Sequence, residues 1–167
     1  MERSLTIALV LLTPYFESAV LGMFPSSVAS IAFYPLVLLL VFSVFPWWQG
    51  AVITLLGGMW HDSVLLAPVL SSLSASFIFA LLYGGLLFFL TNRSLIVDVV
   101  SGSLAYAAYI GTVLLVSNLM AQLNPAEITY SMSLLNWLLG MLVAALFAGF
   151  IRRRPHPHQL SFPFRLL

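Results

Sequence analysis

The chain has 167 residues, of which 62% are hydrophobic and 7% are charged, and its mean hydropathy is +1.09. These values lie far outside the range of soluble domains and predict an integral membrane protein. The chain contains neither Cys nor Lys, which excludes disulfides, thiolate metal sites, a cysteine nucleophile and Schiff-base chemistry, and its few arginines predict no nucleic-acid binding.

Apolar stretches fill most of the chain, and a membrane-crossing helix needs about 20 such residues. We expect an all-α, polytopic membrane protein built as one compact bundle of six transmembrane helices. The run after Arg3 leads to Pro14 and Glu17 rather than to a small-residue cleavage site, so we interpret it as a retained first span. The expected spans are Ser4 to Met23, Val28 to Phe45, Trp48 to His61, Pro68 to Leu90, Leu95 to Met120 and Ser131 to Ile151.

The third span is expected to be a short helix. No Asp, Glu, Lys or Arg occurs between Glu17 and Asp62, a stretch that is too long for one crossing and long enough for two. Pro46, Trp47 and Trp48 supply a helix stop and two indoles that favour the membrane interface, so the turn is predicted there. The helix that follows is predicted to end at His61 and Asp62. A carboxylate at such a helix end is a functional candidate, and an ordinary loop Asp is the alternative.

The positions of the arginines predict the orientation. With six spans, Arg3, Arg93 and the cluster Arg152, Arg153 and Arg154 all fall on one side, which the positive-inside rule assigns to the cytoplasm. Both chain ends are then cytoplasmic. Residues 1–151 are predicted to form a single membrane domain, and residues 152–167 a basic, Pro-rich tail whose arginines meet anionic lipid.

Small residues recur every four positions in three of the expected spans. Because no hydrophobic force drives helices together in lipid, close backbone approach has to supply the contact. We expect these ridges to be internal seams of the bundle, with a surface for a partner protein as the alternative. The ridges are Ser72, Ser76, Ala80 and Gly84 in the fourth span, Ser103, Ala107 and Gly111 in the fifth, and Gly140, Ala144 and Ala148 in the sixth.

Few polar residues could carry chemistry. We expect Glu17 to have no basic partner on its own side of the membrane, and Asp62 or Asn118 could be its polar neighbour. His61 and Asp62 are adjacent and would point about 100° apart on a helix, so they make no metal-binding face. Asp98 fits a helix start that Asn92 or Ser94 caps. No nucleophile–base–orienter set is evident, so we predict neither an enzyme nor a cofactor.

The central part of the chain resembles the MreD family, small multi-span proteins of the bacterial rod-shape and cell-wall elongation system. That family has an early proline in an apolar span, an aromatic or proline turn, a glycine and an aspartate four apart, and a later proline followed by small residues. The corresponding residues here are Pro35, the Pro46-Trp47-Trp48 turn, Gly58, Asp62 and Pro68, then Ser71, Ser72 and Ala75. Leu70 stands where the family usually has a glycine, and Leu36 where it often has an acid.

The resemblance implies a non-enzymatic scaffold in the bacterial cytoplasmic membrane. Its partners would be MreC-like and other membrane proteins of the peptidoglycan-elongation complex. The fold of that family is similar to the substrate-binding subunits of energy-coupling-factor transporters, so capture of a vitamin-type small molecule is the alternative function. Those subunits usually carry an Ala-xxx-Ala stripe in span one, where this chain has Ser4, Ala8 and Leu12.

Overall fold

Helices make up all the regular structure in the part of the chain that the computed structural model describes, which is residues 2–23, 32–65, 70–86, 94–123 and 134–152. A π-helical segment, η1, directly continues α4. The elements are α1 (Glu2–Met23), α2 (Tyr34–Val44), α3 (Trp47–Leu65), α4 (Ser71–Phe79), η1 (Ala80–Gly84), α6 (Leu95–Leu123) and α7 (Leu134–Arg152).

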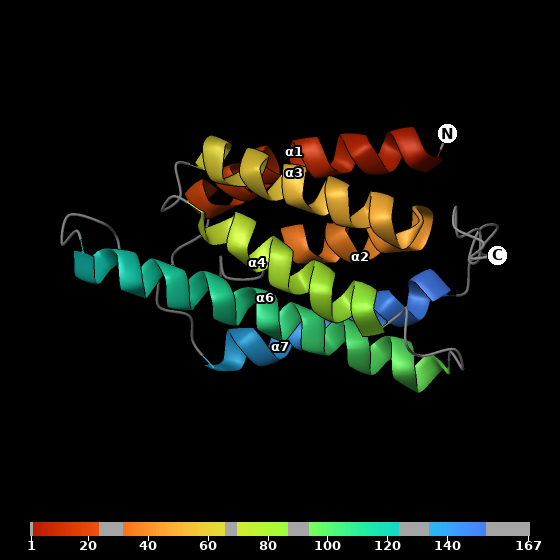
Figure 1. Cartoon of the computed structure of the whole chain (residues 1–167). Coiled ribbons are helices and arrows are strands. Elements are labelled where there is room, and N and C mark those ends of the chain that lie inside the picture. Colours follow the sequence, from red (N-terminus) through yellow and green to blue (C-terminus); the bar gives the residue numbers. More distant parts are fainter. Residues whose placement is uncertain (1, 24–31, 66–69, 87–93, 124–133, 153–167) are drawn as a thin grey trace, which may run out of the picture.

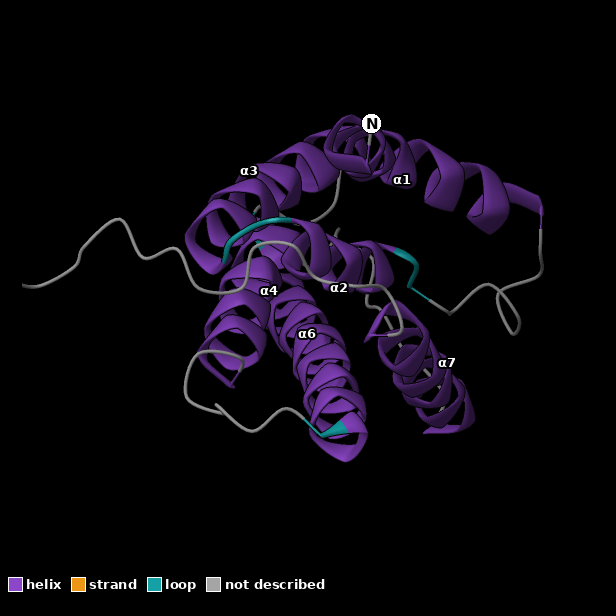
Figure 2. Cartoon of the chain, turned by 90° about the vertical axis from the view of Figure 1, so that its right-hand side faces the viewer, coloured by secondary structure: helices purple, strands orange, loops and turns teal. Residues whose placement is uncertain are grey.

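Successive helices run in alternating directions along one bundle (Figure 1). One end contains the start of α1, the turn between α2 and α3, the start of α6 and the end of α7. At this end the Arg3 guanidinium lies 5.7 Å from the centre of the Phe45 ring, an ordinary cation–π distance. The opposite end contains the second half of α1, the start of α2, the end of α3 and the start of α4. Seen along the bundle, α2 and α4 lie between α1 and α3 on one side and α6 and α7 on the other (Figure 2).

The expected spans agree with the helices to different degrees. As helices, the first and fifth are confirmed, since α1 covers Ser4 to Met23 and α6 covers Leu95 to Met120. The second begins at Tyr34 instead of Val28, because Ala32 and Phe33 are not helical.

The expectation of a short third helix is wrong. α3 has 19 residues and continues to Leu65, whereas α2 has 11. His61 and Asp62 therefore lie inside a helix. They do not have to end it, because both find hydrogen-bond partners on neighbouring helices.

One helix is long and apolar enough to cross a membrane by length and composition. This is the 26-residue segment Leu95–Met120 of α6, about 39 Å long at 1.5 Å per residue, against about 30 Å of bilayer hydrocarbon. Tyr34–Val44, Ser71–Gly84 and Trp137–Ile151 are apolar but shorter. Pro68, Arg93, Arg153 and Arg154 lie outside the described residues, as does nearly all of the predicted tail.

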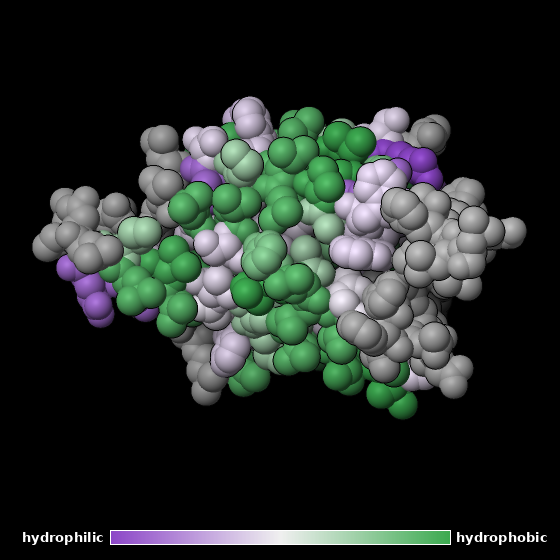
Figure 3. Space-filling view, viewed as in Figure 1, coloured by the Kyte–Doolittle hydropathy of each residue, from purple (hydrophilic) through white to green (hydrophobic). Residues whose placement is uncertain are grey.

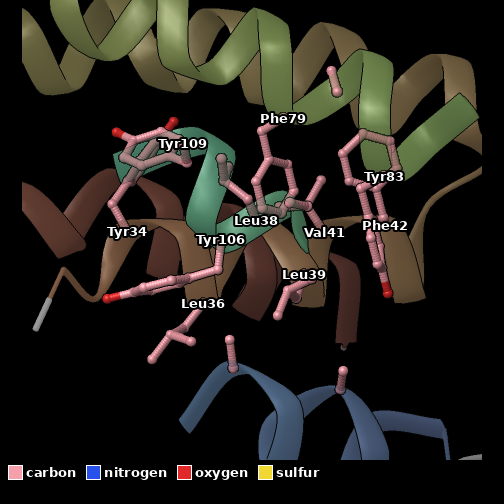
Figure 4. Packing of buried hydrophobic residues seen from close by; sticks show 14 of the residues in the cluster. Tyr34, Leu36, Leu38, Leu39, Val41, Phe42, Phe79, Tyr83, Tyr106 and Tyr109 are labelled. Atoms are coloured by element: carbon pink, nitrogen blue, oxygen red, sulfur yellow. The ribbon is translucent and has the colours of Figure 1, made fainter. Parts of the chain in front are cut away.

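The core is built around α2, whose side chains meet aromatic residues of α4, η1 and α6 (Figure 4). Phe42 packs against Phe79 and Tyr83 with ring centres 6.2 Å and 5.7 Å apart. The buried cluster includes Tyr34, Leu38, Leu39, Val41, Phe42, Phe79, Tyr83, Tyr106, Tyr109, Ala144 and Ala148. Large apolar side chains also cover the outside, including those of Val52, Leu56, Phe77 and Leu81, and Figure 3 shows such a face.

Small residues lie at the helix crossings. Ser72, Ser76, Ala80 and Gly84 are all buried, as are Gly140, Ala144 and Ala148. A Cβ on Gly58 would lie 3.0 Å from the Ser72 carbonyl oxygen, and one on Gly140 would overlap the Tyr106 ring, so both positions need glycine for close approach.

The ridge expected in the fifth span is only partly confirmed, because the Ser103 hydroxyl lies 3.5 Å from the Met141 carbonyl oxygen of α7 but Gly111 makes no such contact. Gly111 is exposed and has open space around it, and Ser103 and Ala107 are only partly buried. Gly102, one position before Ser103, is the residue of α6 that meets Ala148 of α7. The crossing angle of two helices decides which row of small residues contacts the neighbouring helix. Small residues at every fourth position do not decide this by themselves.

Candidate functional site

Glu17, on the second half of α1, is buried and ties its helix to two others. The residue is 8% exposed. Oε1 accepts the backbone N–H of Tyr34 at 2.6 Å, and Oε2 lies 2.6 Å from His61 Nε2. Tyr34 is the first residue of α2 and Pro35 has no N–H, so the Glu17 carboxylate occupies the N-terminal end of α2, where the helix dipole favours negative charge. The expectation that Glu17 has no basic partner is therefore wrong.

His61, on α3, connects Glu17 to α4. Its Nδ1 lies 2.9 Å from Ser72 Oγ, and its ring stacks at a tilt on Tyr34 with centres 4.5 Å apart. When Glu17 is ionised it can only accept, so Nε2 carries the proton in the Glu17 contact. Nδ1 then accepts from the Ser72 hydroxyl if the ring is neutral, or donates to it if the ring is charged. Both nitrogens of this 7% exposed side chain are thus satisfied.

Asp62, the next residue, caps α4 from a neighbouring helix. Oδ1 accepts the Ser72 N–H at 2.8 Å, and Oδ2 accepts the Leu73 N–H at 3.0 Å. The Ser71 hydroxyl donates to Oδ1 at 3.3 Å. The residue at the N-cap position itself, Leu70, cannot cap with its apolar side chain, so Asp62 supplies the acceptors that an N-cap Asp or Ser would provide. The interpretation of Asp62 as a loop carboxylate is wrong.

Leu70 has a backbone conformation that is unusual for its residue type. Its φ is +74°, and it is the one non-glycine residue with positive φ in the part of the chain that is described. The left-handed region costs an L-residue roughly 1–2 kcal/mol, and glycine avoids this cost. The chain therefore needs a glycine-like conformation at the position where the MreD pattern usually has glycine.

We call Glu17, Tyr34, His61, Asp62 and Ser72 the polar clasp. It joins α1, α2, α3 and α4 at the end of the bundle opposite Arg3. Its two carboxylates each meet the N-terminus of another helix, and the imidazole lies between them. This arrangement lets the buried Glu17 and the partly buried Asp62 exist without Lys or Arg, because backbone amides and helix dipoles provide positive potential.

The order Ser72, His61, Glu17 repeats the hydrogen-bond connectivity of a nucleophile, base and orienter, which the sequence did not reveal. Ser72 is only 3% exposed, and its backbone lies against Gly58 of α3. A substrate carbonyl could reach Ser72 Oγ only if α3 and α4 separated. The geometry therefore fits a structural connection between helices. Among the described residues no group of three His, Cys, Asp or Glu is placed to hold a metal ion.

The other predicted residues lie away from the clasp. Asn118 is exposed on α6 and Trp48 is 49% exposed at the start of α3, which begins at the predicted Pro46-Trp47 turn. Ser94 accepts the N–H of Val97 at 3.2 Å, so it caps α6 as one of the two alternatives predicted. An apolar groove of about 380 Å³ lies between α3 and the α4–η1 helix, lined by Trp47, Ala51, Leu55, Phe77, Ala80, Leu81, Gly84 and Gly85.

Sequence reasoning missed His61, Tyr34 and Ser72 as partners of the carboxylates. The expected topology did indicate that Glu17 and His61 could be close, because it assigns the second half of the first span and the end of the third to one side of the membrane.

Comparison of the chain with family models, with curated proteins and with solved structures finds no match.

Proposed function

We propose that this protein is a polytopic membrane protein that crosses the membrane six times. Three observations support it: the helices alternate in direction, large apolar side chains cover the outside, and the polar clasp is turned inward. In lipid, buried charges have to be paired, and Glu17 is paired with His61.

The orientation that we propose places both chain ends in the cytoplasm. Arg3 and the end of α7 at Arg152 lie at the same end of the bundle, which agrees with the positive-inside rule. Because the chain has no Cys, single cysteines can be introduced at Glu2 and at His158 and labelled with a membrane-impermeant maleimide. We expect both to react only after the membrane is permeabilised. Labelling of one of them in intact cells contradicts six crossings.

We propose further that the protein acts as a non-enzymatic scaffold of the cell-shape and peptidoglycan-elongation machinery in a bacterial cytoplasmic membrane. The observation that carries this proposal is the joint action of the residues of the MreD pattern. Gly58 and Asp62 both face α4, one allowing close approach and the other capping its N-terminus, and Leu70 takes the glycine-like conformation. The contact between α3 and α4 would then explain three positions of the MreD pattern together: Gly58, Asp62 and the glycine position that Leu70 occupies here.

Both carboxylates of the clasp are already bonded within the protein, which favours a scaffold over a small-molecule capture subunit. Glu17 and His61 use their polar atoms on each other and on Tyr34 and Ser72. A capture subunit for a polar vitamin needs convergent polar groups that are free to bind the ligand.

Depletion and affinity purification test the proposal. Depletion in a rod-shaped host should give round cells. MreC-like and wall-synthesis proteins should co-purify with the tagged protein in mild detergent. Glu2→Gln, an exposed change at the Arg3 end, is the control variant and should purify with the same partners. Rod-shaped cells after depletion, or co-purification of an ATPase module and a vitamin, would reject the scaffold and favour the transporter subunit.

A further inference from the structure

Three helices bring buried hydroxyl groups to one region of the core, next to Tyr34. Thr54 of α3 and Ser76 of α4 are fully buried, and Tyr109 of α6 is 2% exposed. None of the three hydroxyl oxygens makes a hydrogen bond of ordinary geometry within the described structure. The Tyr34 hydroxyl donates to the Thr54 carbonyl oxygen at 3.3 Å, which is a long bond.

These groups lie close to one another. The rings of Tyr34 and Tyr109 pack with centres 5.9 Å apart, and Figure 4 shows both hydroxyls on the side facing α4. Two glycines of α3 lie directly against them. A Cβ on Gly57 would collide with the Tyr34 hydroxyl, and a Cβ on Gly58 would lie 2.6 Å from Ser76 Oγ. The hydroxyls therefore converge at the part of α3 that has no side chains, Gly57 and Gly58.

A buried hydroxyl without a partner is costly, and structures that converge several of them usually hold water that makes two to four hydrogen bonds. We propose that Tyr34, Thr54, Ser76 and Tyr109 form a buried hydration site that binds one or two water molecules. Its ligand chemistry is neutral, since hydroxyl groups, which can donate or accept, and the Thr54 carbonyl, which accepts, line it. This inference does not depend on the scaffold function.

The hydration site extends the polar clasp into the bundle. Ser76 lies one helical turn after Ser72 on α4, and Thr54 lies about two turns before His61 on α3. The bound water would join the two sets of groups into one polar seam from Glu17 to Thr54. Such a seam allows α3, α4 and α6 to adjust against one another by exchanging water-mediated bonds, which dry apolar packing does not permit.

The first test compares two serines that are both fully buried and unpartnered, Ser76 in the site and Ser117 two turns beyond Tyr109 on α6. In the full-length protein in detergent, Ser76→Ala should lower the Tm by about 2–4 °C relative to Ser117→Ala, because it removes a partner of bound water. Ser117→Ala should leave the Tm unchanged or raise it, because it removes an unpaired hydroxyl. An unchanged or raised Tm for both variants, or an equal fall in both, overturns the hydration site.

The second test needs no variant. Hydroxyl radicals made by X-ray radiolysis modify side chains that contact ordered water even inside a bundle. Tyr34 and Tyr109 should therefore be modified faster than Tyr106, which is equally buried but packs against Gly140. Equal and slow modification of all three tyrosines overturns the proposal. A Tm that rises in NaCl over choline chloride would also overturn it, because it indicates a sodium ion in place of water.

Discussion

Removing the Glu17 carboxylate should be among the most damaging single changes in this bundle. Glu17→Ala leaves the Tyr34 N–H and the His61 ring nitrogen without their 2.6 Å partner in a buried region. Bonds to a charged group contribute about 1.5–3 kcal/mol each, and we take the lower value for each of the two bonds. Two bonds at about 1.5 kcal/mol each give a loss of about 3 kcal/mol. At about 2–4 °C per kcal/mol this corresponds to a Tm lower by about 6–12 °C.

Glu17→Gln separates hydrogen bonding from charge. The Gln carbonyl can accept the Tyr34 N–H while its NH₂ group donates to His61 Nε2, provided that the ring carries its proton on Nδ1 and donates to Ser72 Oγ. We therefore expect a loss of only about 1 kcal/mol, the difference between charged and neutral bonds.

Thermal unfolding in detergent, followed by circular dichroism, measures both variants against the wild type. Glu2→Ala, at the exposed first turn of α1, is the matched control and should change the free energy of unfolding by less than about 1 kcal/mol. The clasp is refuted as a stabilising element if Glu17→Ala unfolds like the wild type, or if the control loses as much stability.

Three further variants test the α3–α4 contact by the same unfolding assay. The Asp62→Asn variant should insert normally but lose about 1 kcal/mol of unfolding free energy. Its NH₂ group would face one of the two backbone N–H groups of α4 from which the carboxylate accepts hydrogen bonds. Wild-type stability of this variant would mean that the cap contributes nothing. Gly58→Ala should destabilise the protein by steric overlap with α4. Gly111→Ala, at a position with open space, should stabilise it by about 0.5–1 kcal/mol through helix propensity. Equal effects of the two variants would contradict close packing at Gly58. Leu70→Gly should raise stability by about 0.5 kcal/mol by relieving the positive φ, whereas Leu104→Gly in α6, which is similarly exposed, should lower it by about 1 kcal/mol; a loss in both would argue against strain at Leu70.

The sequence by itself determined the helical class and the places where most helices lie. Hydropathy decides this, because a run of about 20 apolar residues has few alternatives to a helix. The first and fifth spans were predicted within two or three residues, as was the helix start at Trp47 after Pro46. The small residues correctly predicted the helix contacts of α4 and α7, because small side chains let two helix backbones approach closely.

Only the tertiary structure decided which polar groups meet. Glu17 and His61 are 44 positions apart, and no local pattern relates them. The same holds for the end of α3, which was predicted at His61 and Asp62, before a second proline, yet α1 and α4 supply hydrogen-bond partners that let both residues lie inside the helix. Hydropathy is a property of each residue alone, whereas the free energy of a buried carboxylate depends on what faces it across the bundle, and that is fixed only when the helices pack.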